Sequence, residues 1–218
     1  MEGTLMALLL ILALGAADPG PLVIDAGADL YPADALAQKL EGDVAVKLSV
    51  SADGALRCSA PGGGAMAPLK RASCELVAAR DIFPPRVEKG QAVPADYSVI
   101  VRWKLGTSNR QFGGAVPIGR AGWIRYSDYP PIAWRQVNTG KVRIAYDITA
   151  QGRPQNCRIE STNTTQALAG NMCPLFVERA IFLPALDPDG KPRPTRGWFN
   201  LDWRWCETAR CPAPDTGE

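Results

Sequence analysis

The six cysteines are the residues of this chain whose spacing most clearly indicates a chemistry. Cys58 and Cys74 are sixteen positions apart, and Cys157 and Cys173 repeat that separation. Four thiolates are a ligand set for zinc, but zinc-binding cysteines usually come as CxxC pairs, and the chain has none. The repeated spacing therefore favours two disulfides, Cys58–Cys74 and Cys157–Cys173, over a metal site.

Cys206 and Cys211 are five positions apart beside a proline, and we expect them to form a third, local disulfide. Six cysteines allow 15 pairings in principle, and the repeated spacing narrows that choice. Disulfides persist in oxidising compartments, so this prediction is tied to export from the cytoplasm.

Catalytic and cofactor chemistry has little support in the sequence. The chain has no histidine, which removes the commonest general base and a favoured metal ligand. It also has no Ser-His-Asp set and no phosphate-binding loop, and Asp25, Asp29, Asp128 and Asp147 are interpreted as turn and surface residues. We therefore expect no enzyme, no cofactor and no bound metal.

The composition and the N-terminus indicate an exported globular protein. The 218 residues are 46% hydrophobic and 21% charged, and the net charge of +2 forms no basic stripe, so nucleic acid is not an expected partner. The apolar stretch Leu5 to Ala17 is about 13 residues long, short of the roughly 17–25 that span a bilayer. It ends in small residues, so residues 1–17 are predicted to be a cleaved signal peptide. The alternatives are a buried strand or a short uncleaved anchor, which would hold the protein in the inner membrane facing the periplasm.

The rest of the chain contains one unit twice. Tyr31-Pro32 recurs as Tyr129-Pro130, and later residues recur in the same order at offsets that drift only from 98 to 100. The other matching pairs are Gly42 and Gly140, Gly54 and Gly152, Cys58 and Cys157, Cys74 and Cys173, Gly90 and Gly190, Pro94 and Pro194, and Trp103 and Trp203. Two copies are too few for a solenoid, so we predict two tandem domains.

The predicted domains span residues 20–105 and 123–206. The Gly-rich stretch 106–122 between them is interpreted as a linker, and residues 207–218 as a loose tail. Because the linker is polar and rich in glycine, we expect the two domains to fold separately.

Each unit is predicted to run helix–strand–strand–helix–strand. A short helix follows each Tyr-Pro pair, at 33–40 and 132–137, and alternating apolar residues then predict strands at 42–50 and 140–148. "SADGAL" and "TAQGRP" are typical of hairpin turns, so the chain returns in a second strand that carries the first cysteine of each pair. A second helix carries the other cysteine, and a last strand closes the unit after a Pro-rich bend.

The predicted fold class is therefore α+β, with two small tandem domains, each a three-stranded antiparallel sheet with two helices on one face. In each domain one disulfide would pin the second helix to the sheet. Closing a loop of about 15 residues stabilises a fold by roughly 3 kcal/mol, which matters for a core of about 80 residues.

The second unit resembles the C-terminal domain of the TonB family of energy transducers. The resemblance rests on "DYPPIAWRQVNTGKVRIAYDITAQGRPQNC" and on the bend "FLPALDPDGKPRP". With Gly122-Trp123 shortly before Asp128-Tyr129-Pro130, this unit is similar to the cysteine-containing periplasmic members. The first unit keeps Tyr31-Pro32, Asp53-Gly54 and the bend Phe83-Pro84-Pro85.

The resemblance implies a domain in the periplasm of a Gram-negative bacterium that binds a short receptor segment by adding a strand to its sheet. The family's histidine-bearing anchor and long Pro-rich spacer are expected to be missing here. We therefore interpret the chain as a binding or adaptor protein that engages extended peptide segments of envelope proteins, including outer-membrane receptors. One alternative is an energy transducer for TonB-dependent transport, with ExbB/ExbD-like partners if an anchor lies upstream; another is a structural envelope module that only dimerises.

The last strand of the second unit, predicted over 198–205, is the expected binding edge. Its core-facing residues are predicted to be Phe199, Leu201, Trp203 and Trp205. The candidates for peptide contact alternate with them and are Trp198, Asn200, Asp202 and Arg204, together with Tyr129, a neighbour that the resemblance implies.

Overall fold

The computed structural model describes residues 21–62, 64–80, 82–135 and 138–204. The predicted signal peptide, the Cys206–Cys211 bridge, Trp205 and the tail lie outside these residues and stay predictions. None of the helices in this part of the chain is long and apolar enough to cross a membrane.

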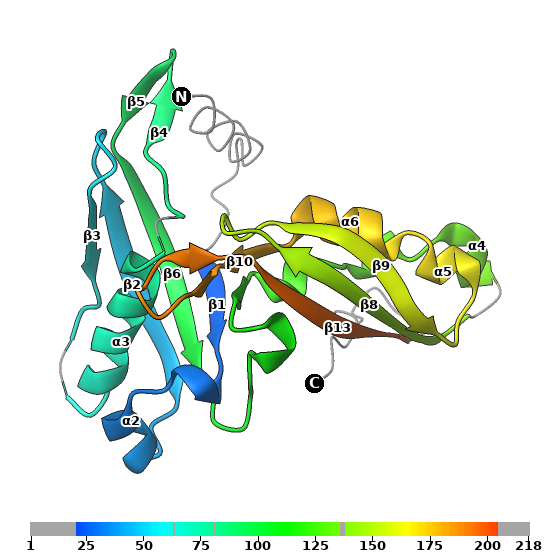
Figure 1. Cartoon of the computed structure of the whole chain (residues 1–218), viewed down its shortest axis with the longest axis horizontal. Helices are drawn as coiled ribbons and strands as arrows, with labels where there is room; N and C mark the ends of the chain where they lie inside the picture. The colour runs from blue at the N-terminus through cyan, green and yellow to red at the C-terminus, as the bar shows by residue number, and fades with distance from the viewer. Residues whose placement is uncertain (1–20, 63, 81, 136–137, 205–218) are drawn as a thin grey trace.

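Two sheets lie side by side in the structure (Figure 1). The first has six strands in the order β10-β7-β1-β6-β2-β3, and the second has three in the order β13-β8-β9. The strand bounds are β1 Leu22–Ala26, β2 Gly42–Val50, β3 Leu56–Ser59, β6 Ala95–Trp103, β7 Val116–Ile118, β8 Gly140–Ile148, β9 Pro154–Thr162, β10 Ile181–Leu183 and β13 Thr195–Trp203. Two separate hairpins pair β4 (Arg86–Glu88) with β5 (Gln91–Val93) and β11 (Ala185–Leu186) with β12 (Pro192–Arg193).

The long strands form where apolar and polar residues alternate. In β2 every second residue is buried and packs in the core, and β2 pairs antiparallel with both β3 and β6. In the second unit β8 pairs antiparallel with β9 and β13 in the same way. The strands predicted at 42–50 and 140–148 are confirmed, whereas the last strand of the second unit begins at Thr195, before the predicted start.

The helices follow the predicted order but not the predicted lengths. Their bounds are α2 Ala33–Ala37, α3 Ala67–Ala78, α4 Pro131–Arg135, α5 Gln166–Ala169 and α6 Met172–Arg179. The second helix of the second unit is therefore split into α5 and α6. Pro174 lies in the first turn of α6, where its missing N–H breaks no helical hydrogen bond, so the helix starts late rather than kinking.

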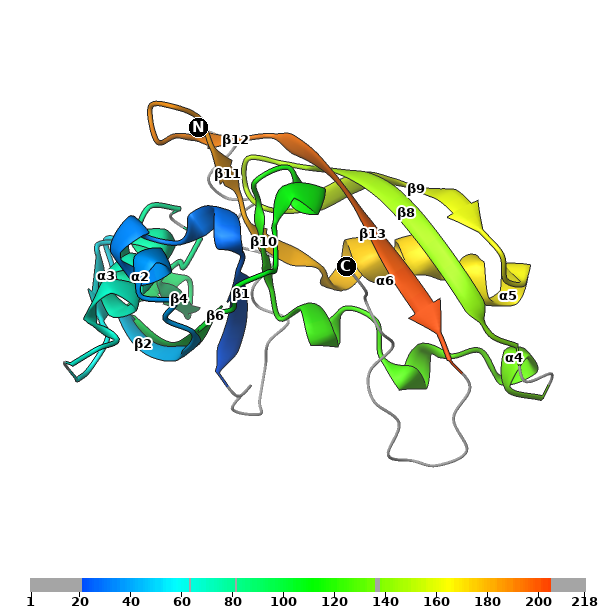
Figure 2. The ribbon, with the colours of Figure 1, turned by 90° about the horizontal axis from the view of Figure 1, so that it is seen from below.

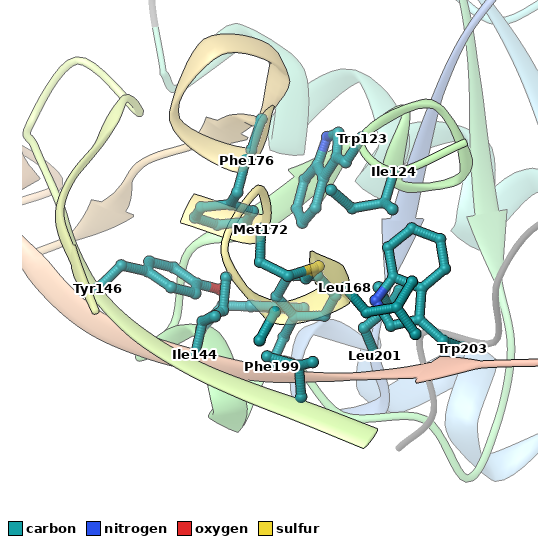
Figure 3. Packing of buried hydrophobic residues seen from close by; sticks show 14 of the residues in the cluster. Trp123, Ile124, Ile144, Tyr146, Leu168, Met172, Phe176, Phe199, Leu201 and Trp203 are labelled. Carbon is teal, nitrogen blue, oxygen red and sulfur yellow. The ribbon is translucent and has the colours of Figure 1, made fainter. Parts of the chain in front are cut away.

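Aromatic side chains dominate the core of the second unit (Figure 3). Trp123 packs edge-on against Phe176 with ring centroids 5.5 Å apart, and Phe176 lies 5.4 Å from Phe199 of β13. Met172 and Phe176 place the buried face of α6 over this cluster. The helices of this unit thus cover the face of the sheet that carries Phe199, and leave the other face of β13 turned outward.

Both disulfides that the repeated spacing predicted are confirmed. Cys58–Cys74 joins β3 to α3, and Cys157–Cys173 joins β9 to α6. The two bridges have similar Cα–Cα distances of 5.6 and 5.5 Å. Each unit therefore carries its own link between the second helix and the sheet.

The stretch 106–122 was expected to be a linker, and the structure corrects that expectation. It contains the 3-10 helices η2 (Arg110–Phe112) and η3 (Arg120–Gly122), with β7 between them. Phe112 is buried in the core of the second unit, and Val116 is buried in the core of the first. Apolar residues beyond the polar start of this stretch thus pack into both units.

One sheet and one buried arginine connect the two units. β7 pairs with β10 of the second unit on one side and with β1 on the other, so the six-stranded sheet contains strands from both units. Arg80, which is only 7% exposed, donates from Nε to the carbonyl oxygen of Pro184 over 3.0 Å. This shared sheet argues against the expectation that the units fold separately.

The fold class is α+β with two tandem units, as predicted. The second unit has the predicted three-stranded sheet. In the first unit the equivalent strands β6, β2 and β3 are part of the larger sheet, because β1 adds in parallel to β6. The sequence repeat is also a structural repeat: Tyr31 meets Trp103 at 5.1 Å and 80°, and Tyr129 meets Trp203 at 5.4 Å and 84°.

Candidate peptide-binding edge

β13 forms one edge of the three-stranded sheet. It pairs with β8 through nine consecutive residue pairs, from Thr195↔Ile148 to Trp203↔Gly140, without a bulge. No strand in the described part of the chain pairs with its other side. A regular edge strand presents a row of main-chain N–H and C=O groups, so it can accept an added strand. The prediction that the last strand of this unit lies at a sheet edge is confirmed.

The equivalent strand of the first unit, β6, already carries such an added strand. β1 lies parallel to β6 in continuous register from Leu22↔Val99 to Ala26↔Trp103. Residues 99–103 correspond to 199–203 in the repeat, so β1 covers the part of β6 that is equivalent to Phe199–Trp203 of β13. The molecule therefore contains one covered and one uncovered copy of the same edge.

The segment that could cover β13 in the same way takes another conformation. At the offset of 98, β1 corresponds to residues 120–124, which form η3 followed by Trp123 and Ile124. Both of these side chains are buried, and Trp123 Nε1 donates to the carbonyl oxygen of Ile118 over 2.9 Å. Gly122 stands where β1 has Ile24, and glycine favours a strand far less than isoleucine does. This segment is therefore packed into the core beside Phe199, as Figure 3 shows, and does not pair with β13.

The predicted alternation of β13 is confirmed for its described residues. Phe199, Leu201 and Trp203 are buried, while Trp198, Asn200 and Asp202 are partly exposed on the other face, and Arg204, beyond the end of the strand, is exposed. Figure 2 shows β13 along its length at the side of this sheet. Trp198, Asn200 and Asp202 thus lie along one outward line of the strand, and Arg204 follows directly after its end.

Three of these candidates have defined neighbours. The guanidinium of Arg143 lies 3.9 Å from the centre of the Trp198 ring, and Arg143 also pairs with Glu160. Arg204 pairs with Asp202 over 3.0 Å, and 68% of the arginine side chain is exposed to solvent. Trp198 therefore has a cation of the neighbouring strand over its ring, whereas Asp202 has a solvent-exposed and easily exchanged partner.

Tyr129 lies apart from the other candidates. It is only 3% exposed, packs against Trp203 on the inner face and donates its hydroxyl to the carbonyl oxygen of Asn138. Tyr129 thus supports the end of β13 from the inner face of the sheet, through its contact with Trp203. Direct contact between this side chain and a peptide on the outer face is not favoured by this burial.

The other edge of the same sheet is less suited to strand addition. β9 has two register irregularities against β8, and Asn156 within it has a positive φ of 53°. Bulges bend and twist an edge strand and so hinder pairing with another chain. The regular edge is the one formed by β13.

Comparison with known proteins explains why the two units match. The family model described as the Gram-negative bacterial TonB protein C-terminal matches residues 28–105 and, separately, residues 125–205. The chain belongs to the TonB C-terminal family. Comparison with curated proteins and with solved structures finds no match. The family and the two disulfides fit a periplasmic protein.

The first TonB C-terminal domain has a charge arrangement that accompanies its added strand. Arg102 of β6 lies between Asp25 of β1, at 3.5 Å, and Asp43 of β2, at 3.2 Å. Burial raises the pKa of Asp25, and the positive charges of Arg102 and Arg120 partly oppose that rise. The ion pair with Arg102 therefore compensates part of the cost of placing the Asp25 carboxylate on this sheet.

Sequence reasoning missed β1 altogether. The residues Leu22–Ala26 read "LVIDA", a mostly apolar stretch with the β-branched pair Val23 and Ile24, shortly before the first Tyr-Pro unit of this TonB C-terminal chain. That composition is typical of a strand, but nothing in it indicates which sheet edge the strand would join. The covered edge in the first domain is thus a finding of the structure.

Proposed function

We propose that the second TonB C-terminal domain binds an extended peptide segment of an envelope protein by strand addition at β13. The bound segment would pair with residues 199–203, and the chain would act as a binding or adaptor protein rather than as an enzyme. The observation that carries this proposal is the pair of equivalent edges, one covered by β1 and the other without a strand among the described residues.

The first domain supports the proposal through the strand that it already carries at the equivalent edge. β1 is a five-residue extended segment on the equivalent strand, so the geometry of this edge accepts such a segment. Main-chain pairing supplies affinity, while the side chains beside the edge supply specificity. Because β1 fills its edge, the first domain is not expected to bind a peptide there, and it would serve to hold the second domain.

An energy transducer that works with ExbB/ExbD-like proteins is a second candidate. The family match supports this candidate, because TonB proteins share this C-terminal domain. It needs a membrane anchor, so identifying an in-frame start upstream and testing the resulting segment for insertion would decide between transducer and adaptor. A structural module that only dimerises is a third candidate and makes a different prediction for the experiment below.

The proposal is tested with the full exported chain and an array of short peptides from periplasm-facing segments of outer-membrane proteins. We expect a subset of peptides to bind and to shift the backbone amide resonances of residues 199–203. Asn200→Pro removes one main-chain donor from this strand and is expected to weaken binding at least tenfold, whereas Asn200→Ala keeps the donor and should bind nearly as well.

Circular dichroism of both variants shows whether the fold is retained. If the proline variant folds and binds like the parent, or if bound peptides shift only residues away from β13, strand addition at this edge is wrong. Failure of every peptide, together with a dimer in light scattering, would favour the structural module instead.

A further inference from the structure

We propose that β13 selects a parallel segment whose outward side chain opposite Asp202 is a lysine or an arginine. This inference rests on the proposed function and adds the chemistry of the partner. It comes from comparing the charges on β1, β6 and β2 with those at the equivalent positions of the second domain.

The first domain provides the template for the bound strand. In β1, Leu22, Ile24 and Ala26 pack with the core of the first domain, while Asp25 on the other face pairs with Arg102. Arg102 is also the direct cross-strand partner of Asp43. Across three neighbouring strands the outer face therefore reads acidic, basic, acidic.

In the second domain β13 and β8 are equivalent to β6 and β2. At the positions of Arg102 and Asp43 they carry residues of the opposite charge. Arg102 corresponds to Asp202 at the offset of 100, and Asp43 corresponds to Lys141 at the offset of 98. Asp202 and Lys141 are direct cross-strand partners, as Arg102 and Asp43 are. From the edge inward, the outer face carries the acidic Asp202 on β13 and the basic Lys141 on β8. The residue of an added strand that complements Asp202 is therefore basic.

Other charges on this face do not provide the same acceptor. The carboxylate of Asp147 bonds to Asn156 and pairs with Arg196, and Glu160 pairs with Arg143. Asp202 is the acidic residue within the segment 199–203, and its side chain remains 25% exposed. Its pairing with Arg204 is a contact between near neighbours at the surface, and such pairs contribute little, so an incoming cation can exchange with it.

The template also gives the direction and the pattern of the bound segment. β1 is parallel to β6, so the segment is expected to run parallel to β13, with apolar residues at its first and third positions, a basic residue at its fourth and a small residue at its fifth. Two copies of β13 paired in parallel and in register would place Asp202 beside Asp202, which disfavours a second copy as the partner. For this parallel arrangement, charge complementarity favours a segment of another protein with this alternation as the partner.

The test uses two synthetic peptides and the full chain. One peptide has the sequence of residues 20–27, and the other carries the change Asp25→Lys. Both are titrated at low salt while the amide resonances of residues 199–203 are followed. We expect the lysine peptide to bind about three- to tenfold more tightly, because an attractive cross-strand pair replaces a repulsive one.

Variants of the protein locate the effect. Asp202→Lys should reverse the order of the two peptides, and Asp202→Asn should largely remove the difference. Glu178→Gln removes an exposed negative charge from α6 and should leave the difference unchanged. Removing the competing cation in Arg204→Ala should increase the preference for the lysine peptide.

The outcomes separate this inference from the proposed function. Equal binding of both peptides at β13 would overturn the charge preference and leave strand addition standing. If neither peptide shifts β13 while peptides from outer-membrane proteins do, the β1 template is wrong; if none does, both proposals fail. Binding that appears only after truncation behind Arg204, or only as a dimer dissociates, would identify the chain's own end or a second copy as the occupant and overturn the proposal.

Discussion

The two TonB C-terminal domains of this chain differ most at the same sheet edge. In the first domain β1 covers residues 99–103, while in the second the equivalent segment forms η3 and places Trp123 in the core. β1 in turn holds β7 and β10, so the covered edge of the first domain is also where the second domain is attached. One copy of the repeat thus uses its edge for assembly, and the other keeps that edge uncovered by any described strand.

A second difference concerns two equivalent arginines. Arg179 at the end of α6 pairs with Asp128 at 2.6 Å within the second domain. Arg80 is its counterpart at the offset of 99, but Leu30 stands where the second domain has Asp128. Arg80 instead donates to Pro184 and to Leu76. The loss of one acidic residue therefore accompanies the use of this arginine as a contact between domains.

Trp123→Ala is expected to have the largest effect on stability. Trp123 is 1% exposed and packs against Phe176, Phe182 and Phe199, so its removal leaves a large cavity. The free energy of unfolding should fall by about 3–5 kcal/mol. Urea unfolding measures this, with the exposed residue Gln151 changed to Ala as a control. A loss below 1 kcal/mol would mean that this tryptophan is not what keeps residues 120–124 from β13.

Ile24→Ala tests the covered edge. Ile24 is fully buried in the middle of β1 and lies between Val101 of β6 and Ile118 of β7. We expect a loss of about 2–4 kcal/mol and faster amide exchange in both β6 and β10, because β1 connects them. Val23→Ala, a change on the outer face of the same strand, should cost much less. Unchanged exchange in β10 would contradict the role of β1 in joining the domains.

Asp128→Asn tests the ion pair that only the second domain has. Burial by itself would raise the pKa of Asp128, but the hydrogen bonds and charges of Arg179 and Arg125 outweigh it and lower the pKa. The carboxylate therefore stabilises the fold above its unfolded pKa of about 3.9, and this contribution is lost as the pH falls through the lower folded pKa. At pH 7 we expect the variant to be about 1–3 kcal/mol less stable, because Arg179 loses a charged partner.

The difference in the free energy of unfolding between Asp128→Asn and the parent should shrink as the solution is acidified below pH 4. The parent carboxylate then becomes protonated and is neutral, as the asparagine side chain is. Thermal unfolding across the pH range measures it. Leu30→Asn, at the equivalent place in the first domain, provides a pH-independent comparison. A gap that stays constant down to pH 2 would show that the charge of Asp128 is not the source of its contribution.

A charge exchange in the first domain is expected to have the smallest effect. Asp25→Lys should destabilise β1 by about 0.5–1 kcal/mol, because it places two positive charges opposite each other at Arg102. Adding Arg102→Asp and Asp43→Lys reproduces the charges of the second domain and should restore most of the loss. Urea unfolding of Asp25→Lys, of the variant with both Arg102→Asp and Asp43→Lys, and of the triple variant measures the coupling, with the paired changes treated as one step of a thermodynamic cycle. If restoration fails, cross-strand charge does not control which strand this edge accepts.

Several elements were predictable from local pattern. The alternation in 42–50 and 140–148 predicts β2 and β8, and the repeated cysteine spacing predicts Cys58–Cys74 and Cys157–Cys173, because both signals lie within a few tens of residues. The inward and outward residues of β13 followed from the same alternation. The late start of α6 is explained by Pro174, which the structure places in the first turn of that helix.

The stretch 106–122 was not predictable in this way. Its glycines and polar residues are typical of a linker, yet Phe112, Val116 and Ile118 are buried because partner strands from both domains are present. Tyr129 is a similar case, since its position in the Tyr-Pro motif gave no indication that its ring would be covered by Trp203. Burial of this kind depends on residues that are distant in the sequence.

The sequence by itself determined the repeat, the family, the α+β class, the two disulfides and the face that each of residues 198–203 presents. These depend on residue type and spacing within one unit. Only the tertiary structure decided that β1 covers the edge of β6, that β7 and β10 extend the same sheet, and that β13 carries no such strand among the described residues. Strand pairing over long separations uses main-chain groups that every residue has, so side-chain patterns do not reveal which edges meet.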